Sequence, residues 1–118
     1  MICSTAVADS GGMQPLLCGG AEPFWNVTVD DARAAFSTPD EPDAIGYDIP
    51  LATRAEGRDW PLALTLIGSR ETAILVIDRQ TCSDTVSDRA YPYSALLLTQ
   101  RGTDPILLDG CCRPRPSN

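Results

Sequence analysis

The sequence predicts an all-β domain, which is either a small antiparallel β-barrel or a β-sandwich of about seven strands stapled by disulfide bonds. Short apolar runs are separated by turn-forming residues at intervals of about eight to twelve residues, a spacing typical of all-β folds. The runs are bounded by Gly, Pro or charged residues and are too short to favour helices. Five cysteines in 118 residues are a high count, typical of a domain stabilised by oxidised thiols.

The predicted strands share short length and apolar content. They are residues 22–30, 33–38, 45–49, 61–67, 72–77, 93–100 and 105–108. In the first, Trp25, Val27 and Val29 alternate with polar residues, which is the period of a strand with one buried face. We expect the third to end at Pro50, and residues 51–60 to form a connection that faces solvent.

Two pairs of strands are predicted to form hairpins. Residues 61–67 and 72–77 flank the turn-forming segment 68–71, and both runs are apolar on two faces, so we expect this hairpin to lie centrally in the sheet. Residues 93–100 and 105–108 form the second hairpin.

The two ends of the chain differ from the domain between them. Residues 1–15 are small and polar and predict a disordered leader, residues 16–112 a single β domain, and the proline-containing residues 113–118 a disordered tail. The Ala-Val-Ala at residues 6–8 has the form of a signal-peptidase site, which makes the leader a signal-peptide remnant. Alternatively, Cys3 carries a lipid anchor on a polar tether. Both interpretations predict an exported domain, in the periplasm or associated with the cell envelope.

Charge and composition exclude several functions. Acidic residues outnumber basic ones by 16 to 9, and a net charge of -7 argues against a nucleic-acid partner and against anionic lipid. The chain has no histidine, which removes Ser-His-Asp and Cys-His catalysis and imidazole metal sites. We therefore expect no cofactor and no metal, and we expect a monomer.

The cysteine positions predict two disulfides. Cys111 and Cys112 are neighbours, so on an extended backbone their side chains point to opposite faces and need different partners. Cys18 and Cys82 are the partners available, and the sequence leaves open which cysteine takes which. On this prediction Cys3 has no structural partner.

The long polar segment at residues 82–93 is the candidate functional region, because polar loops on a rigid β scaffold commonly carry function. The predicted binding residues come from this segment and from the segment around the first strand. They are Glu22, Trp25, Asp84, Ser87, Asp88, Arg89, Tyr91 and Tyr93. The leading hypothesis is a non-enzymatic envelope domain that binds an unidentified ligand or protein through this face.

The sequence leaves three alternatives to this hypothesis. An envelope hydrolase would use Glu22 and Asp88 as a carboxylate pair, which requires them to lie within about 10 Å of each other across an open pocket. A calcium site would gather Asp84, Ser87 and Asp88, although these residue types also cap turns, the role we favour. A purely structural envelope component would have no site.

Two segments carry a resemblance to a known family. Residues 18–25 (CGGAEPFW) resemble a C-x-G-x-E-P-F-W block, and residues 82–93 with 108–112 resemble a C-S-D-G-M-S-D-x-x-Y-P block and an L-x-G-C close, in a group of uncharacterised bacterial envelope proteins and lipoproteins. The resemblance spans residues 18–112 and implies an exported, membrane-tethered domain, with no activity to carry over. This chain has Thr85 and Val86 where the family has Gly-Met, which puts a turn with positive φ at residue 85 in doubt.

Overall fold

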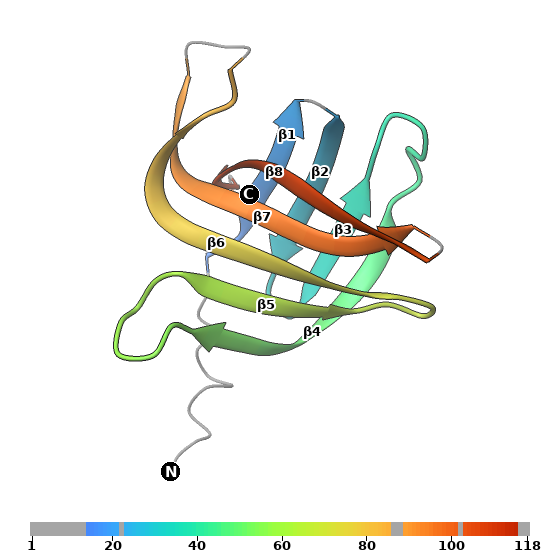
Figure 1. The fold of residues 1–118 in the computed structure, drawn as a ribbon, viewed down its shortest axis with the longest axis horizontal. Helices are drawn as coiled ribbons and strands as arrows, with labels where there is room; N and C mark the ends of the chain where they lie inside the picture. The colour runs from blue at the N-terminus through green and yellow to red at the C-terminus, as the bar shows by residue number, and fades with distance from the viewer. Residues whose placement is uncertain (1–13, 22, 86–88, 102, 116–118) are drawn as a thin grey trace.

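The computed structural model describes residues 14–21, 23–85, 89–101 and 103–115, and these form an all-β fold without helices. Eight strands form a closed antiparallel barrel in which each strand pairs with the next and β8 pairs with β1 (Figure 1). The strands are β1 (Leu16–Ala21), β2 (Phe24–Asp30), β3 (Arg33–Ser37), β4 (Ile45–Arg54), β5 (Leu62–Ile67), β6 (Thr72–Ser83), β7 (Ala90–Arg101) and β8 (Asp104–Pro114). The prediction of an all-β, disulfide-stapled domain is confirmed, and the barrel is the alternative that forms.

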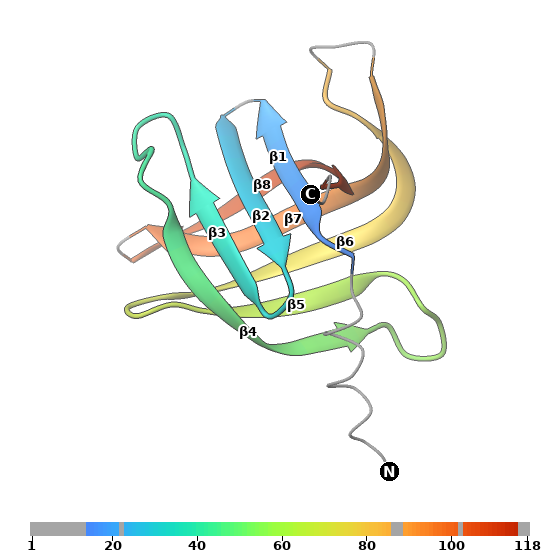
Figure 2. The same ribbon diagram turned by 180° about the vertical axis from the view of Figure 1, so that it is seen from behind.

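The barrel has two walls. Strands β5 to β8 lie side by side on one wall, and β1 to β4 form the other, as the views from both sides show (Figures 1 and 2). The end of β6 and the start of β7 extend beyond the other strands of the barrel (Figure 1). The described residues include no helix long and apolar enough to cross a membrane.

Alternation along the strands fills the interior. Trp25, Val27 and Val29 on β2 are at most 1% exposed, as the two-residue period predicts. The same pattern buries Leu62, Leu64 and Leu66 on β5 and the corresponding residues of β6 and β7, and no charged side chain of the described residues is buried. Hydrophobic burial between the two walls therefore stabilises the fold.

The eighth strand, β1, is the one that sequence periodicity misses. Its residues Gly19 and Gly20 have no side chains to reveal an alternation, and its pairing with β2 and β8 closes the barrel. A Cβ on Gly110 of β8 would lie 2.1 Å from the carbonyl oxygen of Gly19, so the two strands approach too closely there for a side chain.

Two predicted boundaries are wrong. β4 continues through Pro50 to Arg54, because a register shift between Asp48 and Leu51 accommodates the proline. The chain after residue 112 is not a disordered tail at its start, since β8 runs to Pro114 and the N–H of Arg115 donates to the carbonyl oxygen of Pro15. Residues 1–13, with Cys3, and residues 116–118 lie outside the described residues.

The polar segment at residues 82–93 is also less of a loop than predicted. Cys82 pairs with Tyr91 and Ser83 with Ala90, so both ends of the segment belong to the β6–β7 hairpin. The predicted central position of residues 61–67 and 72–77 does not apply, because a closed barrel has no central strand.

Two disulfides form, and they resolve the pairing that the sequence left open. Cys18 bonds to Cys112, its register partner across the β1–β8 seam, and Cys82 bonds to Cys111. The first bond links strands that are 94 residues apart in the sequence, and the second links the β6–β7 hairpin to β8.

Removing each disulfide by paired Cys→Ala substitution is expected to destabilise the barrel. The loss should grow with the conformational entropy that the unfolded chain gains when the disulfide loop is opened. The loss should be about 4.5 kcal/mol for Cys18 with Cys112 and about 3.5 kcal/mol for Cys82 with Cys111. Denaturant unfolding under non-reducing conditions measures both. A larger loss for the second pair would contradict the view that the seam bond contributes more.

A buried phenol is expected to make the barrel sensitive to alkali. Tyr47 is 3% exposed, and its hydroxyl donates a 2.6 Å hydrogen bond to Oε2 of Glu71. Burial, this hydrogen bond and the charge of Glu71 raise the pKa of Tyr47 well above its ordinary value. The unfolded phenol ionises near pH 10 while the folded one keeps its proton, so the stability that this difference contributes is full below pH 10 and is lost as the pH rises above it.

We therefore expect the free energy of unfolding to fall by up to about 1.4 kcal/mol per pH unit above pH 10 through this group. Urea unfolding at pH 8 to 11 measures the slope. Tyr47→Phe should flatten it, and Glu71→Gln should flatten it in part by removing the neighbouring charge. Equal slopes for all three proteins would exclude Tyr47 as the cause.

Candidate functional site

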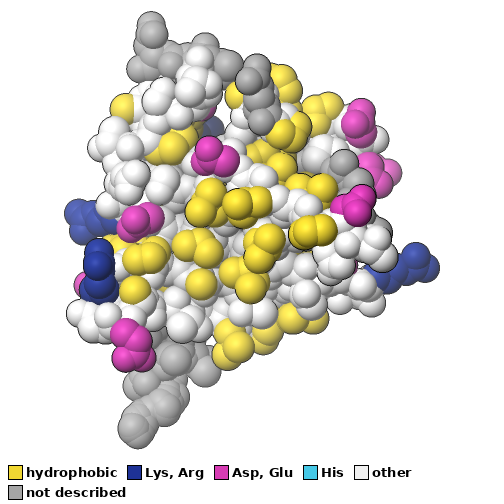
Figure 3. All heavy atoms as spheres, in the orientation of Figure 1, with side chains coloured by type: hydrophobic (Ala, Val, Ile, Leu, Met, Phe, Trp, Pro, Cys, Tyr) yellow, Lys and Arg dark blue, Asp and Glu magenta, His cyan; other side chains and the backbone are white. Residues whose placement is uncertain are grey.

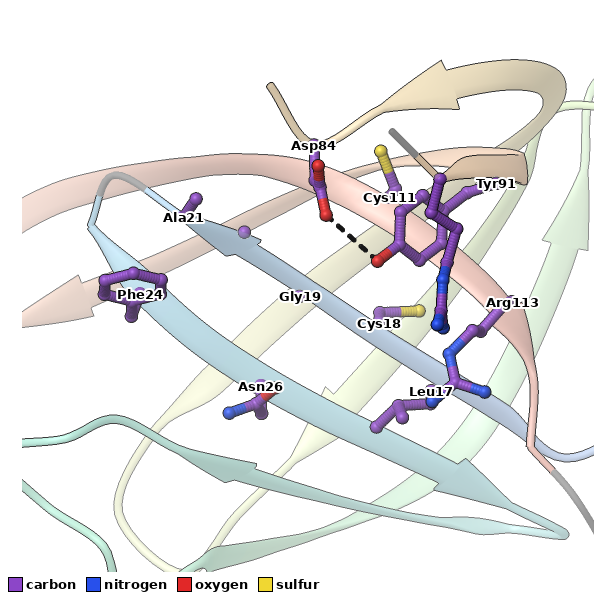
Figure 4. A pocket seen from close by; sticks show the side chains of 12 residues that line it. Leu17, Cys18, Gly19, Ala21, Phe24, Asn26, Asp84, Tyr91, Cys111 and Arg113 are labelled. Atoms are coloured by element: carbon purple, nitrogen blue, oxygen red, sulfur yellow. Dashed lines mark hydrogen bonds between the residues drawn. The ribbon is translucent and has the colours of Figure 1, made fainter. Parts of the chain in front are cut away.

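A cleft of about 210 Å³ lies between the outer surface of the barrel and the overhanging end of the β6–β7 hairpin. Its floor comes from β1 and β2, one side from β8 and the roof from the hairpin (Figure 4). The lining residues are Leu17, Cys18, Gly19, Gly20, Ala21, Phe24, Asn26, Asp84, Arg89, Tyr91, Cys111 and Arg113.

The second disulfide holds the roof over the floor. Cys112 points into the barrel and is fully buried, so its neighbour Cys111 projects from the outer face of β8, where Cys82 reaches it with a Cα–Cα distance of 5.7 Å. Arg113 is two residues further along β8 and therefore projects from the same outer face as Cys111. The same alternation thus places a disulfide and a guanidinium group side by side along the cleft.

The floor is smooth because small residues occupy it. A Cβ on Gly19 would lie 2.6 Å from the carbonyl oxygen of Trp25, so this part of the floor is bare backbone. Phe24 is 59% exposed and lies at one end of the cleft, whereas Arg113 and Leu17 lie at the other (Figure 4). The cleft therefore has an apolar aromatic end and a cationic end.

The roof is held by hydrogen bonds within the hairpin. The hydroxyl of Tyr91 donates to Oδ2 of Asp84 at 3.0 Å (Figure 4). The backbone N–H of Thr85 donates to the Oγ of Ser83, and the Thr85 hydroxyl donates to the carbonyl oxygen of Asp84. These bonds fix Asp84 and Tyr91 as neighbours and order the start of the turn.

Thr85 has a positive φ of 64°, so this position keeps the left-handed turn although it lacks the glycine that suits it. A β-branched residue rarely adopts this conformation. The local hydrogen bonds of the Thr85 backbone and hydroxyl offset part of the cost.

Arginine is the only kind of cation in the chain, and two arginines line this one cleft. Arg89 is exposed on the hairpin and Arg113 is partly buried on β8. Among the described residues that line the cleft, Asp84 is the one carboxylate, and it already accepts from Tyr91. Among the described lining residues, two guanidinium groups therefore accompany one carboxylate.

Trp25 is not an exposed contact, which corrects the sequence prediction. It is 1% exposed, and its indole Nε1 donates to the carbonyl oxygen of Asp109 at 3.1 Å. A Cβ on Gly20 would lie 2.4 Å from that nitrogen, and one on Gly110 would lie 2.9 Å from the indole ring. Trp25 is thus a core residue of β2 whose indole packs where β1 and β8 approach each other closely.

The other predicted residues divide into three groups. Asp84, Arg89 and Tyr91 line the cleft together, and their role in binding stays a prediction. Tyr93 does not line it, because its ring packs against Trp60 with a centroid distance of 5.4 Å.

Glu22, Ser87 and Asp88 form the third group and lie outside the described residues. The carboxylate pair of the hydrolase alternative and the calcium alternative consequently stay predictions.

Sequence reasoning missed Phe24, Asn26 and Arg113. The first two alternate with the buried Trp25, so the period that predicted the core also places them on the outer face. Arg113 was assigned to the tail, and its position two residues after Cys111 was the available signal.

A second hollow, of about 630 Å³, lies at the mouth of the barrel between the β1–β2 turn and the loop after β3. Pro23, Phe24 and Pro39 line it together with Asp40 and Glu41. Phe24 borders both hollows, so the second hollow lies beside the aromatic end of the cleft.

Comparison with known proteins gives no match, since no family model, no curated protein and no solved structure aligns with this chain. The resemblance to envelope proteins and lipoproteins therefore stays a prediction.

Replacing Thr85 by glycine is expected to stabilise the domain. Glycine adopts the observed positive φ without the cost of about 1 to 2 kcal/mol that other residues incur, although its greater freedom in the unfolded chain cancels part of the gain. We expect a net gain of up to about 1 kcal/mol in urea unfolding. The matched control is Asp31→Gly at φ 57°, where aspartate tolerates the conformation and the gain should be smaller. A loss of stability in Thr85→Gly would show that the Thr85 hydroxyl contributes more than the strain costs.

Proposed function

We propose that this chain is an exported, non-enzymatic cell-envelope domain that binds a small ligand bearing a carboxylate or phosphate group in the cleft beneath the β6–β7 hairpin. The observation that carries the proposal is the presence of Arg89 and Arg113 along one cleft of a protein whose net charge is -7.

The cationic end suits an anionic group. Guanidinium groups present planar sets of donors that match the oxygens of carboxylates and phosphates. Arg113 is partly buried on β8, and partial burial strengthens such charge-assisted hydrogen bonds relative to open solvent. Backbone and side-chain groups of Gly19 and Asn26 provide further polar contacts on the floor.

The aromatic end suits an apolar portion of the same ligand. Phe24 exposes 59% of its surface beside the cleft, although a phenylalanine on a β-strand gains free energy by burial. The second hollow, which Phe24 also lines, gives room for the apolar portion of the ligand to extend. The ligand class is therefore an amphipathic small acid.

The proposal leaves catalysis out because Asp84 is the one carboxylate among the described lining residues, and it already accepts a hydrogen bond from the Tyr91 hydroxyl. Export is supported by the two disulfides, because such bonds persist in oxidising compartments.

Titration of the full-length protein with probe anions tests this proposal. Hexanoate and phenyl phosphate combine an anionic group with an apolar portion, and inorganic phosphate and acetate lack the apolar portion. In ¹H–¹⁵N NMR spectra we expect shifts concentrated at Gly19, Tyr91 and Arg113. Arg113→Gln should weaken binding of hexanoate or phenyl phosphate roughly tenfold or more, as expected for loss of a charged hydrogen bond. Phe24→Ser should weaken these two probes and leave inorganic phosphate unchanged.

Arg70→Gln is the matched control, because Arg70 is an exposed arginine in the turn between β5 and β6 and does not line the cleft. It should bind as the wild type does. Shifts spread over all arginines, or an equal effect of Arg70→Gln and Arg113→Gln, would show general charge attraction and contradict the proposal. The absence of saturable binding by every probe would do the same.

A further inference from the structure

Five strands carry a continuous uncharged row of side chains on the outside of the barrel. The pairing registers place Leu51 beside Thr65, Thr65 beside Ile74, Ile74 beside Leu98 and Leu98 beside Leu107, from β4 to β8. We call these five residues, four of them aliphatic and one a threonine, the apolar row. Side chains at paired positions on one face of a sheet are direct neighbours, so the row forms one surface.

The apolar row is flanked by further apolar side chains. Val76 and Leu96 are paired on the next outward positions of β6 and β7, and Ile67 lies at the end of β5. The spheres in Figure 3 show hydrophobic side chains gathered on this wall, with acidic ones toward its borders. Asp109, the register partner of Leu96, is the nearest charged residue along β8.

These side chains are open to solvent. Leu51, Ile74, Leu98 and Leu107 are 60%, 41%, 47% and 63% exposed, and Ile67 and Leu96 are 39% and 44% exposed. Together the six present on the order of 500 Å² of apolar surface, near the upper limit for the largest patch on a monomeric protein. Isolated exposed leucines are ordinary, but a row across five strands indicates an interaction surface.

We propose that the apolar row is the interface of a homodimer, in which the outer faces of β4 to β8 of two copies pack against each other about a two-fold axis. A standard interface buries roughly 800 Å² on each partner, of which about 65% is apolar in homodimers, or on the order of 500 Å². The area of the row and its flanks meets that requirement. This proposal replaces the expectation of a monomer.

A second copy fits this surface better than other occupants. An isologous interface places the same patch on both sides, so an uncharged patch meets no charge that it must complement. The net charge of -7 opposes binding to an anionic bilayer, and the row has no aromatic or basic residue to anchor in lipid headgroups. Repulsion between the two acidic copies is reduced because their carboxylates lie outside the row.

The dimer leaves the ligand cleft open. Leu107 and Arg113 are both on β8 but are six residues apart, which is about 20 Å along an extended strand. The homodimer proposal is therefore independent of the proposed ligand binding, and either can fail without the other.

Sedimentation velocity of the full-length chain from about 1 to 200 µM tests the proposal. We expect a concentration-dependent dimer with a dissociation constant in the micromolar range. Leu98→Glu should weaken dimerisation at least about a hundredfold, because a two-fold interface contains the substitution twice. Ile74→Thr, which removes apolar surface without adding charge, should weaken it less.

Thr28→Glu is the control, since Thr28 faces outward on β2 in the opposite wall and is partly exposed. It should dimerise as the wild type does, and circular dichroism of all three variants should show the same fold. A wild type that stays monomeric to 200 µM, or a dimer that Leu98→Glu leaves intact, would overturn the proposal. So would equal dissociation by Thr28→Glu, or a monomer that floats with phosphatidylcholine vesicles and loses this binding in Leu98→Glu, which would assign the row to lipid.

Discussion

The structure depends on one geometric constraint, which is that adjacent residues in a β-strand point to opposite faces. In β8 the adjacent residues are Cys111 and Cys112. Cys112 points inward and bonds to Cys18 across the seam, so the barrel is closed covalently where its first and last strands meet. Cys111 points outward and bonds to Cys82, so the β6–β7 hairpin is fastened over the outside of the same seam. One dipeptide therefore both closes the barrel and attaches the element that creates the cleft.

The seam is also where the backbone packs most tightly. Gly20 of β1 and Gly110 of β8 leave room for the indole of Trp25, whose nitrogen donates to the carbonyl oxygen of Asp109, and Gly19 leaves room for the backbone carbonyl of Trp25. Glycine is needed here because a side chain would collide with backbone, and the same lack of side chains makes the floor of the cleft smooth. Core packing and the shape of the candidate site thus have a common cause.

The inner and outer faces of the barrel have different roles. The inner faces are filled by aliphatic side chains and stabilise the fold, whereas the outer faces differ between the two walls. The surface under the hairpin combines Phe24 with arginines from two distant segments, and this is the basis of the proposed anionic ligand. The outer faces of β4 to β8 carry the apolar row, which is the basis of the proposed homodimer. Both surfaces are formed by outward-facing strand residues, which the two-residue alternation alone would predict to be ordinary solvent-facing positions.

The sequence by itself determined the all-β class, most strand positions and the pairing of Cys18 and Cys82 with the vicinal cysteines, because these follow from local alternation and from the count of thiols. It also identified the polar segment that contains Asp84, Arg89 and Tyr91 as a candidate region. It did not reveal β1, where Gly19 and Gly20 leave no pattern, or the burial of Trp25. Only the tertiary structure decided that Arg113 and Phe24 join the cleft and that five strands align one apolar row, because these neighbours are set by strand register and barrel closure between residues far apart in the chain.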